Sequence, residues 1–185
     1  MKNFERKNLL FSQCGLNCGL CPMRVDGYCP GCGGGEGNQP CAVARCSREH
    51  PEIAYCFECG QFPCDKYQDA DAFDSFIPHR NRMKDTARAQ KIGMEAYRKE
   101  QISKMEILYY LLGDYNDGRR KSFFCTAVNL LSLADLESVA EELREKTELF
   151  QLPVKQRAAA AVSLLQDAAE RCGISLKLNK KPKIK

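Results

Sequence analysis

The run Cys14-Gly-Leu-Asn-Cys18-Gly-Leu-Cys21-Pro22 opens the segment that decides how this chain folds. Residues 14–64 hold ten of the twelve cysteines of the chain, together with many glycines and prolines and few large apolar side chains. A segment of this composition cannot fold on a hydrophobic core alone, so a cross-link must hold it together. The cysteines concerned are Cys14, Cys18, Cys21, Cys29, Cys32, Cys41, Cys46, Cys56, Cys59 and Cys64.

The spacing of these cysteines favours metal ions over disulfides as the cross-link. Two intervening residues let a tight turn aim both thiolates at one ion, and three pairs have this spacing: Cys18/Cys21, Cys29/Cys32 and Cys56/Cys59. The first eleven residues contain no apolar run long enough for a signal peptide. We therefore expect a cytoplasmic protein with reduced thiols, and a secreted domain stapled by disulfides is the less favoured alternative.

Ten thiols suit two four-cysteine zinc sites with two thiols left over. The first candidate set has the spacing Cys-x2-Cys-x7-Cys-x2-Cys and consists of Cys18, Cys21, Cys29 and Cys32. The second candidate set consists of Cys46, Cys56, Cys59 and Cys64. Cys41 competes for the place of Cys46, and Cys14 is either spare or displaces a member of the first set. The sequence thus predicts about two zinc ions in this segment.

Iron–sulfur clusters are the rival interpretation. The spacing Cys14-x3-Cys18-x2-Cys21 is the one that holds the cluster of radical S-adenosylmethionine enzymes, and proline after Cys21 and Cys29 is typical of ferredoxin runs. A radical enzyme would need a β/α barrel after the motif, whereas only cysteine loops and helical patterns follow here. [4Fe–4S] clusters that serve electron transfer, redox sensing or small-molecule redox catalysis remain the alternative.

From about residue 65 the pattern changes to amphipathic helices. We expect helices over 82–101 with a break at Gly93, over 105–112, over 122–131, over about 133–149 and from Pro153 to Cys172. A capping box, Ser132-Leu-Ala-Asp135, opens the fourth of these, and Gly173 ends the last. The chain is therefore predicted to be mainly α, with an N-terminal cysteine-rich, loop-dominated metal-binding module (1–67) packed on a C-terminal helical bundle (68–174) and followed by a basic tail (175–185).

The order of the cysteine motifs resembles a known family. Cys-Gly-Leu-x-Cys-x-x-Cys-Pro, Cys-Pro-Gly-Cys, Cys-x4-Cys and Cys-x-x-Cys-x-x-Phe-Pro-Cys follow one another, and the run from Tyr115 to Cys125 is similar to a second block of longer members. On these residues the chain resembles the cysteine-rich domain-of-unknown-function family 3795 of bacteria and archaea, over roughly residues 12–135. The resemblance implies that the ten cysteines bind zinc or an iron–sulfur cluster, and it implies no particular activity.

A basic run lies at the expected start of the third helix, and we interpret it as a candidate site for an anionic ligand. Three cations meet free backbone N–H groups and the positive end of the helix dipole there. The residues are Arg119, Arg120, Lys121 and Ser122. A solvated basic loop is the default. Cys125 follows one turn later and is expected in the core, the alternative being a reactive thiol of an enzyme site.

Charge and hydropathy limit the partners of this chain. No stretch approaches the length of a membrane span, so we expect no membrane partner. Residues 1–67 carry seven basic and seven acidic side chains, and bound thiolates would make this part acidic. Nucleic acid is therefore an unlikely partner, because metal modules that bind it normally carry an excess of Lys and Arg. We expect a binding or scaffold module, and the sequence names neither a partner nor a reaction.

Overall fold

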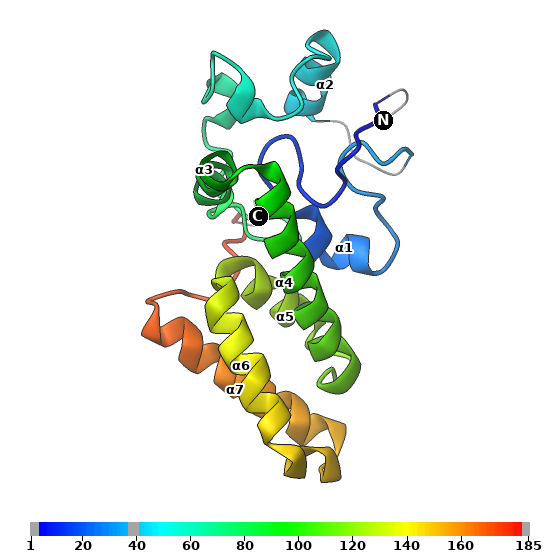
Figure 1. The fold of residues 1–185 in the computed structure, drawn as a ribbon, viewed down its shortest axis with the longest axis vertical. Coiled ribbons are helices and arrows are strands. Elements are labelled where there is room, and N and C mark those ends of the chain that lie inside the picture. The colour runs from blue at the N-terminus through cyan, green and yellow to red at the C-terminus, as the bar shows by residue number, and fades with distance from the viewer. Residues whose placement is uncertain (1–3, 37–40, 183–185) are drawn as a thin grey trace.

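The computed structural model describes residues 4–36 and 41–182, and the fold is mainly α (Figure 1). Within these ranges the chain forms seven α-helices and no extended strand; a single bridge pairs Glu5 with Gly34. The α-helices are α1 (Pro22–Val25), α2 (Ala42–Glu49), α3 (Arg82–Ile92), α4 (Met94–Asp114), α5 (Lys121–Leu130), α6 (Leu133–Glu145) and α7 (Val154–Arg171). Four 3-10 turns complete the list: η1 (Cys18–Leu20), η2 (Cys56–Glu58), η3 (Asp65–Tyr67) and η4 (Thr147–Gln151).

The helix boundaries follow local signals in most places. Gly93 separates α3 from α4 at a φ of +82°, as expected, and the Ser132 side chain accepts from the N–H of Asp135 at the start of α6. The expectation of a separate helix over 105–112 is wrong, because α4 runs without interruption from Met94 to Asp114. The fourth helix is shorter than expected: it ends at Glu145, and η4 then turns Leu149 into the core.

Helices α4 to α7 form the main hydrophobic core (Figure 1). The second half of α4 contributes Leu108 and Leu111 to it at helical spacing, and Tyr115, directly after the helix, continues this buried series. The bundle closes over side chains with no measurable exposure, namely Phe124, Val128, Leu136, Leu143, Ala161 and Leu165. Burial of each Phe, Leu or Val side chain among them contributes about 1.5–3 kcal/mol, so this core stabilises the helical part without any metal.

The cysteine-rich segment lacks a core of this kind and is loop-dominated, as the sequence predicts. Its main apolar cluster consists of Phe11 and Tyr55 packed on Tyr97 and Ala89, which belong to α4 and α3. The Phe11 ring meets the Tyr97 ring edge-on at a centroid distance of 4.9 Å. The segment therefore completes its apolar packing on the helices rather than within itself.

Two buried asparagines attach the segment to the helices. Asn17 donates to Asp85 of α3 (2.9 Å) and accepts from the hydroxyl of Tyr97 (3.0 Å). Asn129 of α5 donates to the backbone oxygen of Leu20 (3.3 Å), whose side chain lies in the bundle core. The cysteine loops from 12 to 20 are thus fixed to α3, α4 and α5 by both polar and apolar contacts.

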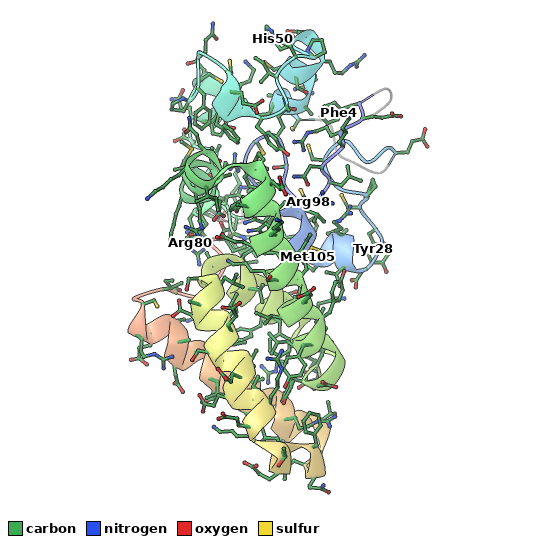
Figure 2. The ribbon with its side chains drawn as sticks, viewed as in Figure 1. Phe4, Tyr28, His50, Arg80, Arg98 and Met105 are labelled. Atoms are coloured by element: carbon green, nitrogen blue, oxygen red, sulfur yellow. The ribbon has the colours of Figure 1, made fainter. Side chains whose placement is uncertain are left out.

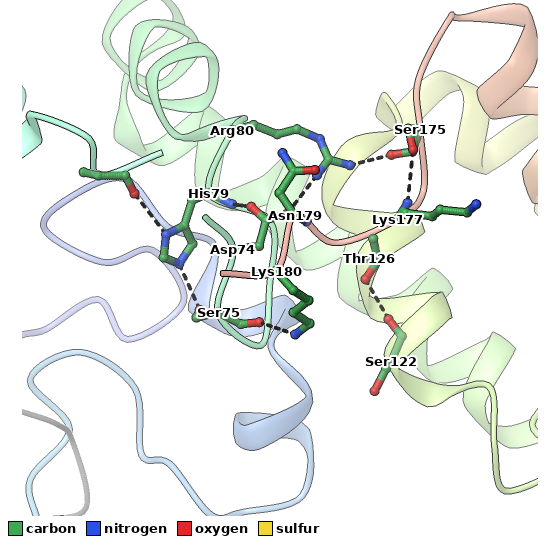
Figure 3. Close-up of polar contacts among 11 residues, drawn as sticks. Asp74, Ser75, His79, Arg80, Ser122, Thr126, Ser175, Lys177, Asn179 and Lys180 are labelled. Carbon is green, nitrogen blue, oxygen red and sulfur yellow. Dashed lines mark hydrogen bonds and ion pairs between the residues drawn. The ribbon is translucent and has the colours of Figure 1, made fainter. Parts of the chain in front are cut away.

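The residues after α7 return to the loop before α3 (Figure 3). The carboxylate of Asp74, which has no exposed surface, accepts from the N–H of His79 (2.6 Å), from Arg80 (2.9 Å) and from the N–H of Asn179 (2.7 Å). Arg80 also donates to the backbone oxygen of Ser175. Residues 175–180 of the expected basic tail are therefore held by hydrogen bonds. No helix of the described residues combines the length and the apolar character needed to cross a membrane.

Candidate metal centre

Four cysteines of the N-terminal segment line one small cavity. They are Cys46, Cys56, Cys59 and Cys64, and His50 lines it with them. The cavity has a volume of about 40 Å³, slightly more than the ~30 Å³ that one water molecule occupies in the liquid. A space of this size is large enough for a single ion. These four cysteines are the second set that the sequence predicts.

Three short elements bring these thiols together. Cys46 lies in the middle of α2, and His50 ends this helix. Cys56 opens η2 and Cys59 follows it directly, so that the Cys-x-x-Cys pair spans a single tight turn. Cys64 comes after the Phe62–Pro63 bond, which is cis, and precedes η3. Figure 2 shows His50 at the end of the molecule that carries α2, far from the α6–α7 pair.

The Cys56 thiol in this cavity has a raised pKa. Its pKa is raised to about 11, mainly by burial and to a smaller extent by the nearby thiols of Cys14, Cys64 and Cys46, while the hydroxyl of Tyr67 opposes the rise. Burial and the contact with Cys56 likewise raise the pKa of Tyr67. Among the described residues the Tyr67 hydroxyl has no hydrogen-bond partner of regular geometry. A cation at this place would remove the cost of bringing ionised thiols together.

The thiols of the first predicted set lie close enough to influence one another. Burial raises the pKa of Cys18 to about 12, and Cys32, Cys14 and Cys21 are close enough to add to the rise. Burial also raises the pKa of Cys21, with Cys29 adding to it. Backbone N–H groups lower both values, from Cys32 toward the sulfur of Cys18 and from residues 23 and 24 toward that of Cys21. Backbone N–H groups that donate to a sulfur in this way stabilise its ionised form, which is the form that binds a metal.

The cysteine spacing assigns Cys14 and Cys41 to no single site. Cys14 lies between the two groups, because its thiol raises the pKa of Cys18 and Cys32 on one side and of Cys56 on the other. Its sulfur is 3.2 Å from the hydroxyl of Ser12. Cys41 caps α2, accepts from the N–H of Ala44 (3.3 Å) and is exposed. Its thiol influences the pKa of Cys32.

The thiols of the two predicted sets lie near one another, but they do not form a coordination shell. All twelve cysteines are free. Across residues 4–36 and 41–182, no three side chains of His, Cys, Asp or Glu are arranged so that they could hold a metal ion. Zinc–sulfur bonds are about 2.3 Å long, so the thiols around the cavity would have to turn inward to bind one ion.

The basic run before α5 is largely paired with acidic side chains. Arg120 lies 3.6 Å from Asp117, and Lys121, the first residue of α5, forms an ion pair with Asp26. The side chain of Arg119 is exposed, and the backbone oxygen of Ser122 accepts from Thr126 (2.8 Å). The anionic ligand predicted at Arg119, Arg120, Lys121 and Ser122 stays a prediction, and such a ligand would compete with two carboxylates.

Cys125 lies in the core of the bundle and is fully buried. Burial raises the pKa of its thiol to about 12, and Cys21 adds to the rise. The helix N-terminus and Lys121 therefore do not produce a thiolate here, which supports the interpretation of Cys125 as a core residue. Cys172, at the end of α7, is exposed and lies 3.7 Å from a carboxylate oxygen of Asp135.

Sequence reasoning missed two buried polar residues of α4, Gln101 and Lys104. Together with the half-buried Asp85 of α3 they line a second cavity, and no motif marks them. The signal that could have found them is their register: Gln101 and Lys104 lie on the same stripe of α4 as Tyr97, Leu108 and Leu111, all of which are buried. A search of protein-family models, of curated proteins and of solved structures finds nothing that matches this chain.

Proposed function

We propose that the chain is a metal-binding protein in which cysteine-ligated zinc ions organise the N-terminal segment as a binding or scaffold module. One observation carries the proposal: Cys46, Cys56, Cys59 and Cys64 line a single cavity of about 40 Å³. Four thiolates suit the closed tetrahedral coordination of structural zinc, which leaves no open position for catalysis. The order of the cysteine motifs remains the ground for relating the chain to family 3795, and dense free cysteines suit a compartment that keeps thiols reduced, such as the cytoplasm.

A second ion would use the first predicted set, Cys18, Cys21, Cys29 and Cys32. Cys14 lies near Cys18 and Cys32 and is the natural substitute ligand. The backbone amides that face the sulfurs of Cys18 and Cys21 support binding, because they stabilise the ionised thiol. The same arrangement suits iron, whose clusters are also held by cysteine thiolates, so the identity of the metal has to be measured.

The test is the metal and sulfide content of protein purified without oxygen, compared among single Cys→Ser variants. Cys46→Ser, Cys56→Ser and Cys59→Ser each remove one thiol from the cavity, and Cys172→Ser is the matched control because Cys172 is exposed and lies outside the segment. We expect about two zinc ions per wild-type chain, about one fewer in each cavity variant and no change in the control.

Two other results would contradict parts of this proposal. Iron with equimolar sulfide and a broad visible absorption would replace structural zinc by an iron–sulfur cluster and make redox chemistry the working function. A wild-type protein that holds no metal under these conditions would refute metal binding altogether. Chelation of bound zinc is expected to unfold the cysteine loops, since metal binding energy is folding energy for such modules, while the far-UV circular dichroism of α4 to α7 persists.

A further inference from the structure

A serine and a histidine face each other in the loop before α3 (Figure 3). Nε2 of His79 lies 2.9 Å from the hydroxyl oxygen of Ser75. The carboxylate of Asp74 closes this loop, because it accepts from the backbone N–H of His79 (2.6 Å). Ile77, halfway between the two residues, is only 3% exposed and anchors the loop in the protein. The fold of the loop, and not their own hydrogen bond alone, therefore holds the two side chains together.

The other ring nitrogen decides which tautomer His79 adopts. Nδ1 lies 3.1 Å from the backbone oxygen of Ala70, and a carbonyl oxygen can only accept a hydrogen bond. Nδ1 therefore carries the proton of the neutral ring, which leaves Nε2 with a free electron pair directed at Ser75. Burial lowers the pKa of His79 and the guanidinium of Arg82 adds to this, while the bond to Ala70 and two nearby carboxylates oppose it. The ring is thus a neutral base at neutral pH.

The serine of this pair is open to solvent. Ser75 is exposed and His79 is half-buried, so a molecule from solvent can reach the hydroxyl while the loop still fixes the base. A hydroxyl within hydrogen-bond reach of a base, with the base oriented by a third group, is the arrangement that activates a nucleophile. Here the carbonyl of Ala70 is the orienting group.

A cation lies beside the hydroxyl. Lys180 donates from Nζ to the backbone oxygen of Ser75 (3.1 Å), which uses one of its three N–H groups. The segment that carries Lys180 is fixed here, because the N–H of Asn179 donates to the Asp74 carboxylate (2.7 Å) and the N–H of Asp74 donates to the backbone oxygen of Asn179 (2.7 Å). Positive charge at this place would stabilise the oxyanion that forms when a hydroxyl attacks a carbonyl group.

Two exposed phenyl rings flank the same hydroxyl in sequence. Phe76 follows Ser75 directly and is 55% exposed, and Phe73 lies two residues before it and is 42% exposed. Rings of this exposure lose water when an apolar group packs on them, and that loss favours binding. A substrate with an apolar group beside its carbonyl carbon would make this contact.

We propose that Ser75 and His79 form a catalytic dyad that hydrolyses carboxylic esters with an apolar acyl group. A carbonyl, and not a carboxylate, orients the imidazole, so the base is weaker than that of a full triad. We therefore expect esters to react rather than amides, since an alcohol leaves more easily than an amine.

The reaction has two halves that use the same two residues. His79 Nε2 takes the hydroxyl proton while Oγ of Ser75 attacks the carbonyl carbon, and the electron pair of the C=O bond moves onto oxygen beside Lys180. The C–O bond to the alcohol then breaks, and the alcohol leaves with the proton from His79. Water attacks the acyl-serine in the same way, with His79 again as the base, and releases the carboxylic acid and free Ser75.

Hydrolysis of p-nitrophenyl butyrate by the full chain tests this dyad. Ser75→Ala removes the nucleophile and keeps the backbone oxygen that accepts from Lys180, and His79→Asn keeps a donor toward Ala70 but removes Nε2. We expect each variant to lower kcat/KM at least about 100-fold. Ser163→Ala, at an exposed serine of α7, is the matched control and should change nothing. Urea denaturation shows which variants are folded, and Ser75→Ala should keep the wild-type midpoint because the side chain is exposed.

The acyl group tests the role of the phenyl rings. Relative to hydrolysis in buffer alone, p-nitrophenyl acetate should react at least about threefold more slowly than the butyrate, because it lacks two methylene groups. Phe76→Ala should reduce this preference and leave the reaction of the acetate nearly unchanged.

Covalent labelling gives a readout that does not depend on turnover. Diisopropyl fluorophosphate forms a bond between Oγ of Ser75 and phosphorus, fluoride leaves, and His79 takes up the hydroxyl proton. Mass spectrometry should find the label in the tryptic peptide 67–80, in which Ser75 is the only serine and which contains no cysteine. Ser75→Ala should not be labelled there, and His79→Asn should be labelled at least about tenfold more slowly.

Three results would overturn the dyad. They are hydrolysis by the wild-type chain that is no faster than in buffer, hydrolysis by folded Ser75→Ala at the wild-type rate, and a label that lies only outside residues 67–80. Neither readout depends on metal content, so the outcome is separate from that of the zinc proposal.

Discussion

Replacement of Gly15 by alanine tests how the cysteine loops are attached to the helices. Gly15 follows Cys14 and has a φ of +93°, in the left-handed region. A Cβ atom at this position would lie 2.2 Å from Oγ1 of Thr86 and 3.1 Å from Cγ of Arg82, both on α3. Thr86 is only 3% exposed and β-branched, so its side chain cannot turn aside freely. The loop must therefore leave α3 or distort when Gly15 gains a methyl group.

The expected destabilisation has two parts. A positive φ costs a non-glycine residue about 1–2 kcal/mol, and overpacking at a buried contact costs about 1–3 kcal/mol. We therefore expect Gly15→Ala to lower the free energy of unfolding by about 2–5 kcal/mol. Gly118→Ala is the matched control, because Gly118 has a similar φ of +86° and its Cβ would meet nothing within 4 Å. That variant should lose only the backbone part, about 1–2 kcal/mol.

Urea denaturation followed by circular dichroism measures both variants, with metal content determined on the same samples. Thr86→Ala in the Gly15→Ala background should recover about 1–3 kcal/mol, since it removes the atom that the new methyl group meets. Thr86→Ala alone should cost about 0.8 kcal/mol for the buried methyl group that it also removes, because Oγ1 of Thr86 has no hydrogen-bond partner among the described residues to lose. If Gly15→Ala destabilises no more than Gly118→Ala, or if Thr86→Ala recovers nothing, the close packing of this loop on α3 is refuted.

Three further changes follow from the structure. Asp74→Ala removes a carboxylate without exposed surface that holds Arg80 and the N–H of Asn179; it should cost about 3–5 kcal/mol and open the residues around Asn179 to trypsin, and an unchanged urea midpoint would contradict it. Burial raises the pKa of Asp85 to about 6, so between about pH 4 and 6 the folded chain binds a proton at Asp85 that the unfolded chain does not. The free energy of unfolding therefore falls as the pH rises through this window, by at most ~1.4 kcal/mol per pH unit. Asp85→Asn should abolish that slope in denaturation curves recorded from pH 4 to 7, and an identical slope in both proteins would show that Asp85 titrates normally. Phe124→Ala should cost about 3–5 kcal/mol because the ring is fully buried, whereas Phe76→Ala, at a ring with 55% exposure, should change the urea midpoint little.

The sequence predicts the helical part well because its signals are local. A polar residue that caps a helix, a glycine at positive φ and an apolar stripe each act within a few residues, and Ser132, Gly93 and Gly173 behave as such signals predict. The wrongly predicted helix break at residues 102–104 also comes from relying on local signals. Lys104 interrupts the apolar stripe of α4 and suggests a break, but its ammonium group reaches the backbone oxygens at the end of α5, so the helix continues.

The candidate sites are less predictable because they depend on contacts between distant residues. The second cysteine set follows from spacing, since Cys56 and Cys59 span one turn and Cys46 and Cys64 flank it within eighteen residues of each other. The position of Cys14 between the two thiol groups does not follow from spacing, because it depends on how the loop packs on α3. The cavity lined by Gln101 cannot be predicted from the sequence, because its walls come from three helices that are separate in the chain.

The bond from Asn129 to the backbone of Leu20 joins residues 109 positions apart, and the contact between Asn17 and Tyr97 joins residues 80 positions apart. Contacts between such distant residues form slowly during folding, because a long loop must close before they stabilise anything. Helices α4 and α5 contain their own hydrogen bonds and can form early. We therefore expect the cysteine loops to reach their final conformation on this surface late in folding, and the step that completes the fold is then also the one that brings the distant thiols together.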